Sequence, residues 1–320
     1  MKISLTDKQG GGIMHEFARI IGAAFHGRFL YIPERLGAGY ITGFSWGNEL
    51  RMMVRNYHLK KDIFIERTNE LAEGAENVCF LLTGVLPSPL RPEKQLSIER
   101  AGVLICMQTV SAVMDMPSNT VFGTVAIVAS RNYLHQLFSK LQHPLIQTIL
   151  ESGDHFVFET GASPEIIKCA SEFLQQPVPE SLESNYYKLK CEELLYYIFA
   201  MLTKRDALPV SGLHIEDIKA IYGVKLKLQS RLSEPPNIAS LAEQAGMSQP
   251  KLRKLFKQIF NKGVFEYYQS ARMQEAARLL KEDRLSVSEV GYQLGFSNLS
   301  HFSKVFGQHM GMKPKKFSGI

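Results

Sequence analysis

A pattern of apolar residues followed by glycine occurs twice in the last third of this 320-residue chain. The first copy runs from Ile238 to Met247, and the second runs from Val287 to Phe296, 49 residues later. In each copy, apolar residues at positions i, i+3 and i+7 come directly before a glycine, Gly246 or Gly295. This spacing predicts a short helix with one buried stripe, and the glycine predicts a left-handed turn where the helix ends.

A second helix is predicted after each turn. Ser248 and Asn298 occupy matching positions, and both residue types are good N-caps. The apolar stripes behind these caps match at an offset of 50 residues: Leu252, Leu255, Phe256 and Ile259 in the first copy, and Phe302, Val305 and Phe306 in the second. The repeat therefore predicts two helix-turn-helix units, over about residues 237–260 and 286–309.

The outer faces of the second helices are the expected DNA contacts. The N-terminal part of such a helix enters the major groove, where Arg and Lys donate to guanine or phosphate, Gln pairs with adenine and Leu contacts a thymine methyl group. The predicted contact residues are Gln249, Pro250, Lys251, Arg253, Lys254 and Lys257 in the first unit, and Leu299, Ser300, His301, Ser303 and Lys304 in the second. The alternative is that the two helical hairpins only carry solvated lysines. This alternative accounts poorly for two units whose apolar and capping positions match.

Charge and spacing agree with this hypothesis. Residues 214–320 hold 17 Lys and Arg against 9 Asp and Glu, a net charge of +8, whereas the rest holds 20 against 22, a net charge of −2. A basic segment of this kind is typical of a protein that meets a polyanion. A continuous helix is predicted over residues 264–282, about 28 Å long, which could hold two recognition helices about one DNA turn, ~34 Å, apart.

Residues 214–320 resemble the C-terminal domain of the AraC/XylS family of bacterial transcription regulators. The resemblance implies an all-α DNA-binding domain whose partners are double-stranded DNA and RNA polymerase. Two positions depart from the family pattern: Ser318 stands where the family usually has Arg, and Pro250 makes a base contact from its position less favourable. The matching motifs are Ile238-Ala-x-x-Leu241-Ala-x-x-Ala245-Gly246-Met247-Ser248, Leu252-x-x-Leu255-Phe256-Lys257, Arg272-x-x-x-Ala276-x-x-Leu279-Leu280, Gly295-Phe296-Ser297-x-x-Ser300-His301-Phe302-Ser303-Lys304-Val305-Phe306 and Gly311-Met312-Lys313-Pro314-x-x-Phe317.

The N-terminal part is predicted to be rich in β-structure, so that the whole chain is α+β. Short runs of β-branched and aromatic residues between turn residues suggest an antiparallel sandwich or barrel, and the family resemblance implies a cupin-like or related sensor domain. We expect an effector-sensing and dimerisation domain over residues 1–203, a linker over 204–213 and the DNA-binding domain over 214–320. The predicted strands are Tyr40–Trp46, Arg51–Leu59, Val78–Thr83, Val103–Thr109 and Val121–Ala129.

The N-terminal part also shows a looser resemblance to regulators of the pyochelin-regulator type, which respond to a ferric siderophore. It rests on the Phe156–Gly161 segment, a helix capped by Ser163 and a Leu-rich helix that ends at Leu202. Aromatic and Met residues that could line an effector pocket are Trp46, Met52, Tyr57 and Phe80. Alternation along the strand sends half of such residues inward simply to build a core, and this alternative stays open.

A long amphipathic helix is predicted over Tyr186–Leu202. It could pack on its own β-domain or pair with its copy in a homodimer, in which case its contacts would be Leu189, Leu194, Leu195 and Ile198. Both roles stay open for this helix.

Several function classes are disfavoured by the residues. The histidines form no metal-binding pair beside a carboxylate, no nucleotide or hydrolase motif occurs, and Cys79, Cys106, Cys169 and Cys191 are far apart. We therefore expect no metal, no cofactor and no enzyme activity. Neither a signal peptide nor a membrane span is predicted, which indicates a cytoplasmic protein. The leading hypothesis is a ligand-responsive transcription activator. The alternatives are an effector-independent dimeric DNA-binding protein and a DNA-modifying enzyme that uses this module.

Overall fold

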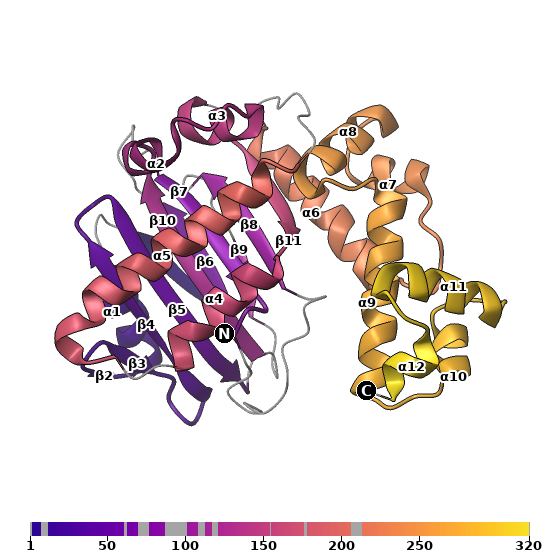
Figure 1. The fold of residues 1–320 in the computed structure, drawn as a ribbon, viewed down its shortest axis with the longest axis horizontal. Helices are drawn as coiled ribbons and strands as arrows, with labels where there is room; N and C mark the ends of the chain where they lie inside the picture. The colour runs from indigo at the N-terminus through magenta and orange to yellow at the C-terminus, as the bar shows by residue number, and fades with distance from the viewer. Residues whose placement is uncertain are drawn as a thin grey trace. The chain divides into compact units, whose positions relative to one another are not determined.

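The computed structural model describes residues 2–7, 12–60, 63–69, 77–86, 101–107, 113–116, 121–153, 155–175, 178–205 and 213–319. The chain forms two compact units, unit 1 from Met1 to Leu213 and unit 2 from His214 to Ile320 (Figure 1). Most of the predicted linker, residues 206–212, lies outside the described residues. The chain is α+β, with an antiparallel sheet in unit 1 and helices in unit 2.

Unit 1 is built on an eight-stranded antiparallel sheet with the order β11-β8-β7-β10-β5-β4-β3-β2. The five predicted strands correspond to β4, β5, β7, β8 and β10, although Gln108 and Thr109 lie outside the described residues. The strands are β2 (Phe25–His26), β3 (Phe29–Tyr31), β4 (Gly37–Trp46), β5 (Leu50–Leu59), β7 (Asn77–Thr83), β8 (Gly102–Met107), β10 (Val121–Ser130) and β11 (Val157–Gly161).

A second, three-stranded sheet has the order β1-β6-β9. Strand β1 (Lys2–Asp7) pairs in parallel with β6 (Ile63–Asn69), and β9 (Val113–Met116) pairs with β6 in the antiparallel sense. Unit 1 therefore has two sheets among its described residues, and the cupin-like barrel stays a prediction.

The main core of unit 1 lies between one face of the large sheet and the helices that follow it. In Figure 1, α5 crosses this face. Alternate residues of β5, such as Leu50, Met52 and Val54, point to that core together with Phe80 of β7. The helices of unit 1 are α1 (Gly12–Ile21), α2 (Arg131–Phe138), α3 (Pro144–Glu151), α4 (Pro164–Gln175) and α5 (Glu180–Leu202).

Helix α5 begins six residues before the predicted start at Tyr186, directly after Pro179. Proline lacks the N–H that a residue inside a helix would donate. Glu180 and Glu183 place negative charge in the first turn, where it interacts favourably with the positive end of the helix dipole. Ser163, the predicted cap of α4, accepts a hydrogen bond from the Ile166 backbone N–H at 3.4 Å. Both helix starts thus follow local chemistry.

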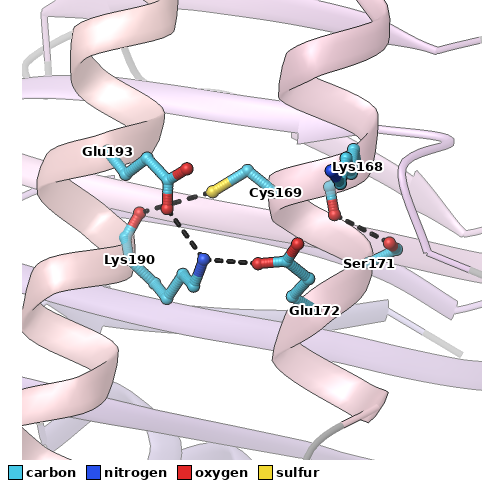
Figure 2. A network of polar contacts seen from close by, with 6 residues as sticks. All are labelled: Lys168, Cys169, Ser171, Glu172, Lys190 and Glu193. Carbon is cyan, nitrogen blue, oxygen red and sulfur yellow. Dashed lines mark hydrogen bonds and ion pairs between the residues drawn. The ribbon is translucent and has the colours of Figure 1, made fainter.

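A network of polar contacts joins α4 and α5 (Figure 2). The Lys190 ammonium of α5 contacts the Glu172 carboxylate of α4 and also donates to Glu193 at 2.8 Å. The hydrogen bond from Lys190 lowers the pKa of Glu193. The Cys169 thiol of α4 lies 3.9 Å from the Lys190 carbonyl oxygen and is itself buried. The two helices therefore pack through a buried thiol beside an ion-pair network.

Unit 2 is entirely helical among its described residues. Helix α9 (Val264–Lys281) runs through it, close to the prediction of 264–282. Buried residues from the second half of α9, such as Met273 and Leu280, pack with the helices that follow it. The other helices are α6 (Ile215–Ser230), α7 (Ile238–Gln244), α8 (Gln249–Phe260), α10 (Val287–Gln293), α11 (Leu299–Met310) and α12 (Pro314–Ser318).

Candidate nucleic-acid interface

Two helix pairs of the same form occur in unit 2, α7 with α8 and α10 with α11. The turns contain Gly246 and Gly295 with φ of +63° and +77°, so both glycines adopt the predicted left-handed conformation. A residue with a Cβ is strained at such a φ, which explains glycine at both positions. The helix ends predicted from the repeat are therefore confirmed.

Side-chain caps begin the helices of both pairs. The Ser248 hydroxyl accepts from the Lys251 backbone N–H at 3.4 Å and so caps α8. The Asn298 side-chain oxygen accepts from the backbone N–H groups of Ser300 and His301, at 2.9 and 3.1 Å, and so caps α11. Both predicted N-caps are confirmed. In the first turns behind these caps, Gln249, Pro250 and Lys251 of α8 and Ser300 and His301 of α11 are exposed. This is the end of the helix that a DNA-binding helix presents to base edges.

The outer face of α8 is polar and exposed, while its inner face is core. Leu252 and Phe256 on the inner face are completely buried. The six predicted contact residues of this helix are all exposed: Gln249, Pro250, Lys251, Arg253, Lys254 and Lys257. Four of the six are cations, so the free face of α8 is strongly basic.

Lys251 has an intramolecular partner that the sequence did not predict. Its ammonium forms an ion pair at 2.8 Å with Asp217 of α6, whose side chain is only 18% exposed. The two residues are 34 positions apart, and they meet only because α6 packs on α8. Lys251 is therefore less available to a phosphate than Arg253, Lys254 or Lys257.

Helix α11 presents fewer charges than α8. Ser300, His301 and Lys304 are exposed, and Ser303 is half-buried. Leu299 is half-buried because it packs on α10, where a Cβ at Gly291 would lie 2.5 Å from a Leu299 methyl group. The side chain predicted to contact thymine therefore contributes to packing between the two helices of this pair.

The four predicted pocket residues do not come together. Met52 and Phe80 are buried in the main core of unit 1. Tyr57 is five residues after Met52 on β5, so it points to the opposite face of the sheet and packs in the separate core around α1. Trp46 is half-buried, stacks on Phe44 and donates its indole N–H to the Ser184 hydroxyl at 3.0 Å.

Three of the four predicted dimer contacts also lie in the core. Leu194, Leu195 and Ile198 are completely buried because that side of α5 packs on its own unit, so they cannot meet a partner chain. Leu189 lies on the outer side of α5 and is exposed. Of the two roles left open for this helix, packing on its own β-domain is observed.

Across the part of the chain that the structure describes, no three His, Cys, Asp or Glu side chains come together as metal ligands. None of the described helices is long and apolar enough to span a bilayer.

Comparisons with known proteins match unit 2. A family model described as a helix-turn-helix domain matches residues 241–319. The probable transcription factor PqrA of Proteus vulgaris is 30% identical over 92 residues, which are 29% of this chain and 75% of that protein. The transcriptional regulator GlxA of Rhizobium meliloti is 32% identical over 95 residues, 30% of this chain and 29% of that protein.

A solved AraC-type regulator from Chromobacterium violaceum is 24% identical, with a TM-score of 0.31, over 33% of this chain and 95% of that one. This chain spans less than half the length of the first curated relatives it matches, 29% of one and 45% of the next. The match to PqrA covers most of that relative, and it agrees with the repeat, the turns and the caps described above. The chain belongs to the AraC/XylS family of helix-turn-helix transcription regulators.

Proposed function

We propose that this protein is a transcription regulator that binds a specific double-stranded DNA site through two helix-turn-helix units in unit 2. The observation that carries the proposal is the duplicated geometry. In each pair a glycine turn leads into a capped helix whose first turns are exposed on one face and buried on the other. Such a helix can enter the major groove while its partner helix supports it.

The two recognition helices have different parts in this proposal. Helix α8, with Arg253, Lys254 and Lys257 on its free face, combines contacts to phosphates with contacts to bases. Helix α11 has one lysine among its predicted contacts, Lys304, so its contribution depends more on hydrogen bonds from Ser300 and His301. We expect the first unit to supply most of the salt-dependent affinity and the second to supply mainly sequence preference.

Helix α9 connects the two pairs. Its 18 residues span about 27 Å at the usual rise of 1.5 Å per residue. Successive major grooves on one face of B-DNA are ~34 Å apart, so a strut of this length can serve two recognition helices. A separation of α8 and α11 near half a DNA turn in a complex would contradict this arrangement.

Alanine substitutions at Arg253 and Lys304 test the proposal. The probe is a duplex enriched by the full chain from a pool of random sequence. If a residue contacts a base, its loss weakens binding by about 1–3 kcal/mol and relaxes specificity at one position. If it contacts phosphate only, the loss is similar on every sequence, and the dependence on salt becomes shallower.

Lys168→Ala is the matched control, because Lys168 is an exposed lysine of unit 1. It should leave binding of the selected duplex unchanged. If neither Arg253→Ala nor Lys304→Ala altered binding of that duplex, the assignment of α8 and α11 as recognition helices would be wrong.

For unit 1 we propose that it binds a small-molecule effector. Binding of this effector would turn the protein into an activator that recruits RNA polymerase. Support comes from the family and from the looser resemblance to regulators of the pyochelin type, which makes a ferric siderophore the first candidate. An effector that binds the active conformation more tightly than the inactive one shifts the population toward it.

Thermal unfolding of the full chain with ferric pyochelin, compared with iron-free pyochelin, tests the effector. A ligand at 100 times its Kd stabilises the protein by about 2.7 kcal/mol, which is a measurable rise in Tm. An unchanged Tm with both compounds would exclude pyochelin as the effector. The same comparison with other ferric siderophores then shows whether any member of this class binds.

An effector-independent dimeric regulator is the second candidate function. The observation in its favour is that Met52, Tyr57 and Phe80, which were expected to line a pocket, are buried in two cores. In that case DNA affinity would stay the same across all effectors tested, and unit 1 would act by dimerisation alone.

For the homodimer we propose the outer side of α5 as the interface. Leu182, Leu189 and Tyr196 are 54%, 65% and 61% exposed, and they follow one another at intervals of seven residues. Seven residues are close to two turns, so the three side chains form one line along the helix. A line of exposed large apolar residues is a surface that a second copy can cover in a two-fold symmetric contact.

A further inference from the structure

The chain segment that leads into the first helix pair contacts the turn of the second pair. A Cβ at Gly295 would lie only 2.0 Å from the carbonyl oxygen of Ser233, in the segment between α6 and α7. Gly246, at the matching position of the first pair, has no such neighbour: apart from the residues on either side of it in the chain, no described atom lies within 4 Å of a Cβ placed there. Of the two glycine turns, only the one at Gly295 is in close contact with another segment of the backbone.

Two side chains of α9 bind the backbone on either side of this contact. Tyr268 donates its hydroxyl hydrogen to the Leu232 carbonyl oxygen at 3.0 Å. Arg272, one helical turn later, donates from Nη2 to the Leu294 carbonyl oxygen at 2.5 Å. One side chain thus holds the segment before the first pair, and the other holds the end of α10 in the second pair.

The guanidinium of Arg272 is enclosed by aromatic rings. Its central carbon lies 3.9 Å from the ring centre of Phe296, directly after the glycine, and 5.2 Å from that of Tyr268. Arg272 is 9% exposed, and burial lowers its pKa. A buried guanidinium is tolerated only when carbonyl groups and ring faces replace its water. The Leu294 carbonyl oxygen and the two ring faces are partners that suit the planar guanidinium group of arginine.

We propose that Tyr268, Arg272 and Gly295 are positioning residues that fix the second helix pair against the first and thereby set the spacing between the two parts of the DNA site. The inference rests on the proposed function, because it requires both pairs to bind DNA. Helix α9 sets how far apart the two pairs lie along its axis, and the junction holds the orientation of the second pair at the turn after α10. A rigid pair of recognition helices tolerates only one spacing, because any other spacing requires the DNA to deform.

The test is in vitro selection with the full chain on duplexes that have a random centre of roughly 40 base pairs, about four helical turns. The wild-type protein should enrich two sequence blocks at one spacing. Insertion of one base pair between the blocks should then weaken binding by about tenfold or more.

Tyr268→Phe removes the hydrogen bond to Leu232 and keeps the ring. Arg272→Lys keeps the positive charge but loses the planar guanidinium group. Both variants should enrich the same two blocks over several spacings, with a penalty of about threefold or less for the inserted base pair. Gly295→Ala should have the largest effect. Gly246→Ala is the matched control: it introduces the same backbone strain without touching the junction, so it should keep the single spacing.

Circular dichroism and thermal unfolding establish that each variant is folded, and Tyr268→Phe carries the test if Gly295→Ala does not fold. Folded Tyr268→Phe and Arg272→Lys proteins that retain the single spacing and the full insertion penalty would overturn the inference. Enrichment of only one block by the wild-type protein would instead overturn the proposal of two DNA-binding units, and this inference with it.

Discussion

Individual residues of unit 2 show how similar sequence positions acquire different roles. Gly246 and Gly295 end matching helices with the same left-handed backbone, yet only Gly295 lies against a second segment of chain. Lys251 and Lys254 are both exposed lysines of α8, yet Lys251 has the Asp217 carboxylate as a partner. A residue's type and position therefore predict its conformation better than they predict its contacts.

The two glycines should differ in what they contribute to stability. Gly246→Ala should lower the free energy of unfolding by about 1–2 kcal/mol, because alanine is strained at positive φ. Gly295→Ala should lower it further, because its Cβ would also overlap the Ser233 carbonyl oxygen. Denaturant unfolding of both variants checks the order, and equal losses would contradict the close contact at Gly295.

Cys106 and Cys169 should react slowly with alkylating agents. Burial raises the pKa of the Cys169 thiol to about 12, and contact with Cys79, together with burial, raises the pKa of Cys106. Only the thiolate is nucleophilic, and an ordinary cysteine has a pKa of about 8.5. At pH 8 both should therefore be labelled by iodoacetamide much more slowly than a free cysteine, with rates that rise as the pH increases.

Mass spectrometry of the labelled peptides measures these rates, with the unfolded protein as the control. Rapid labelling of Cys169 in the folded protein at pH 7 would contradict the prediction. It would also favour the alternative of a DNA-modifying enzyme, because alkyl transfer requires a reactive thiolate.

Among the helices, α5 shows best how packing selects between two possible roles. Its sequence offers apolar residues on more than one side, and the side with Leu194 and Ile198 packs on the sheet. Lys190 then joins α5 to α4 through Glu172, at a point where both helices lie over the sheet (Figure 2).

Lys190→Met should lower the stability of unit 1 by up to about 1 kcal/mol, since the network is partly exposed. The effect should depend on pH. Because Lys190 lowers the pKa of Glu193 below its ordinary value of 4.5, the pair stabilises the folded state above that pH. This contribution is lost as the pH falls through the lowered pKa, so wild type and variant should converge in acid.

Urea unfolding at pH 7 and at lower pH values measures this convergence. Lys168→Met is the control, because Lys168 is an exposed lysine of α4 and its backbone carbonyl oxygen, not its side chain, makes the contact drawn in Figure 2. A stability difference between wild type and Lys190→Met that is independent of pH would contradict the role given to the ion pair.

At the scale of the whole molecule, the two units divide the proposed work. Unit 2 carries the basic excess and the duplicated helix pairs, and unit 1 carries the large sheet and the exposed side of α5. If α5 joins two copies of the chain, two copies of unit 2 act on one DNA site. Loss of the dimer should then weaken DNA binding even though no DNA contact is altered.

Leu189→Lys should therefore convert a dimer into a monomer, because it places a charge at the centre of the exposed line on α5. Analytical ultracentrifugation of wild type and variant measures the change. Leu137→Lys is a matched control, since Leu137 is an exposed leucine of α2. A monomeric wild-type protein, or a Leu189→Lys variant that stays dimeric, would exclude α5 as the interface.

Local sequence patterns suffice to predict most of the helices of unit 2, namely the two helix pairs with their caps at Ser248 and Asn298 and the helix that connects the pairs. These features depend on interactions within a few residues, so spacing and residue type suffice to predict them. Long-range packing fixes which side of α5 is buried, the ion pair between Lys251 and Asp217, and the hydrogen bond from Arg272 to the Leu294 carbonyl oxygen beside Gly295. These contacts join residues far apart in the chain, and they form only when whole elements pack, which the period of a single helix does not encode.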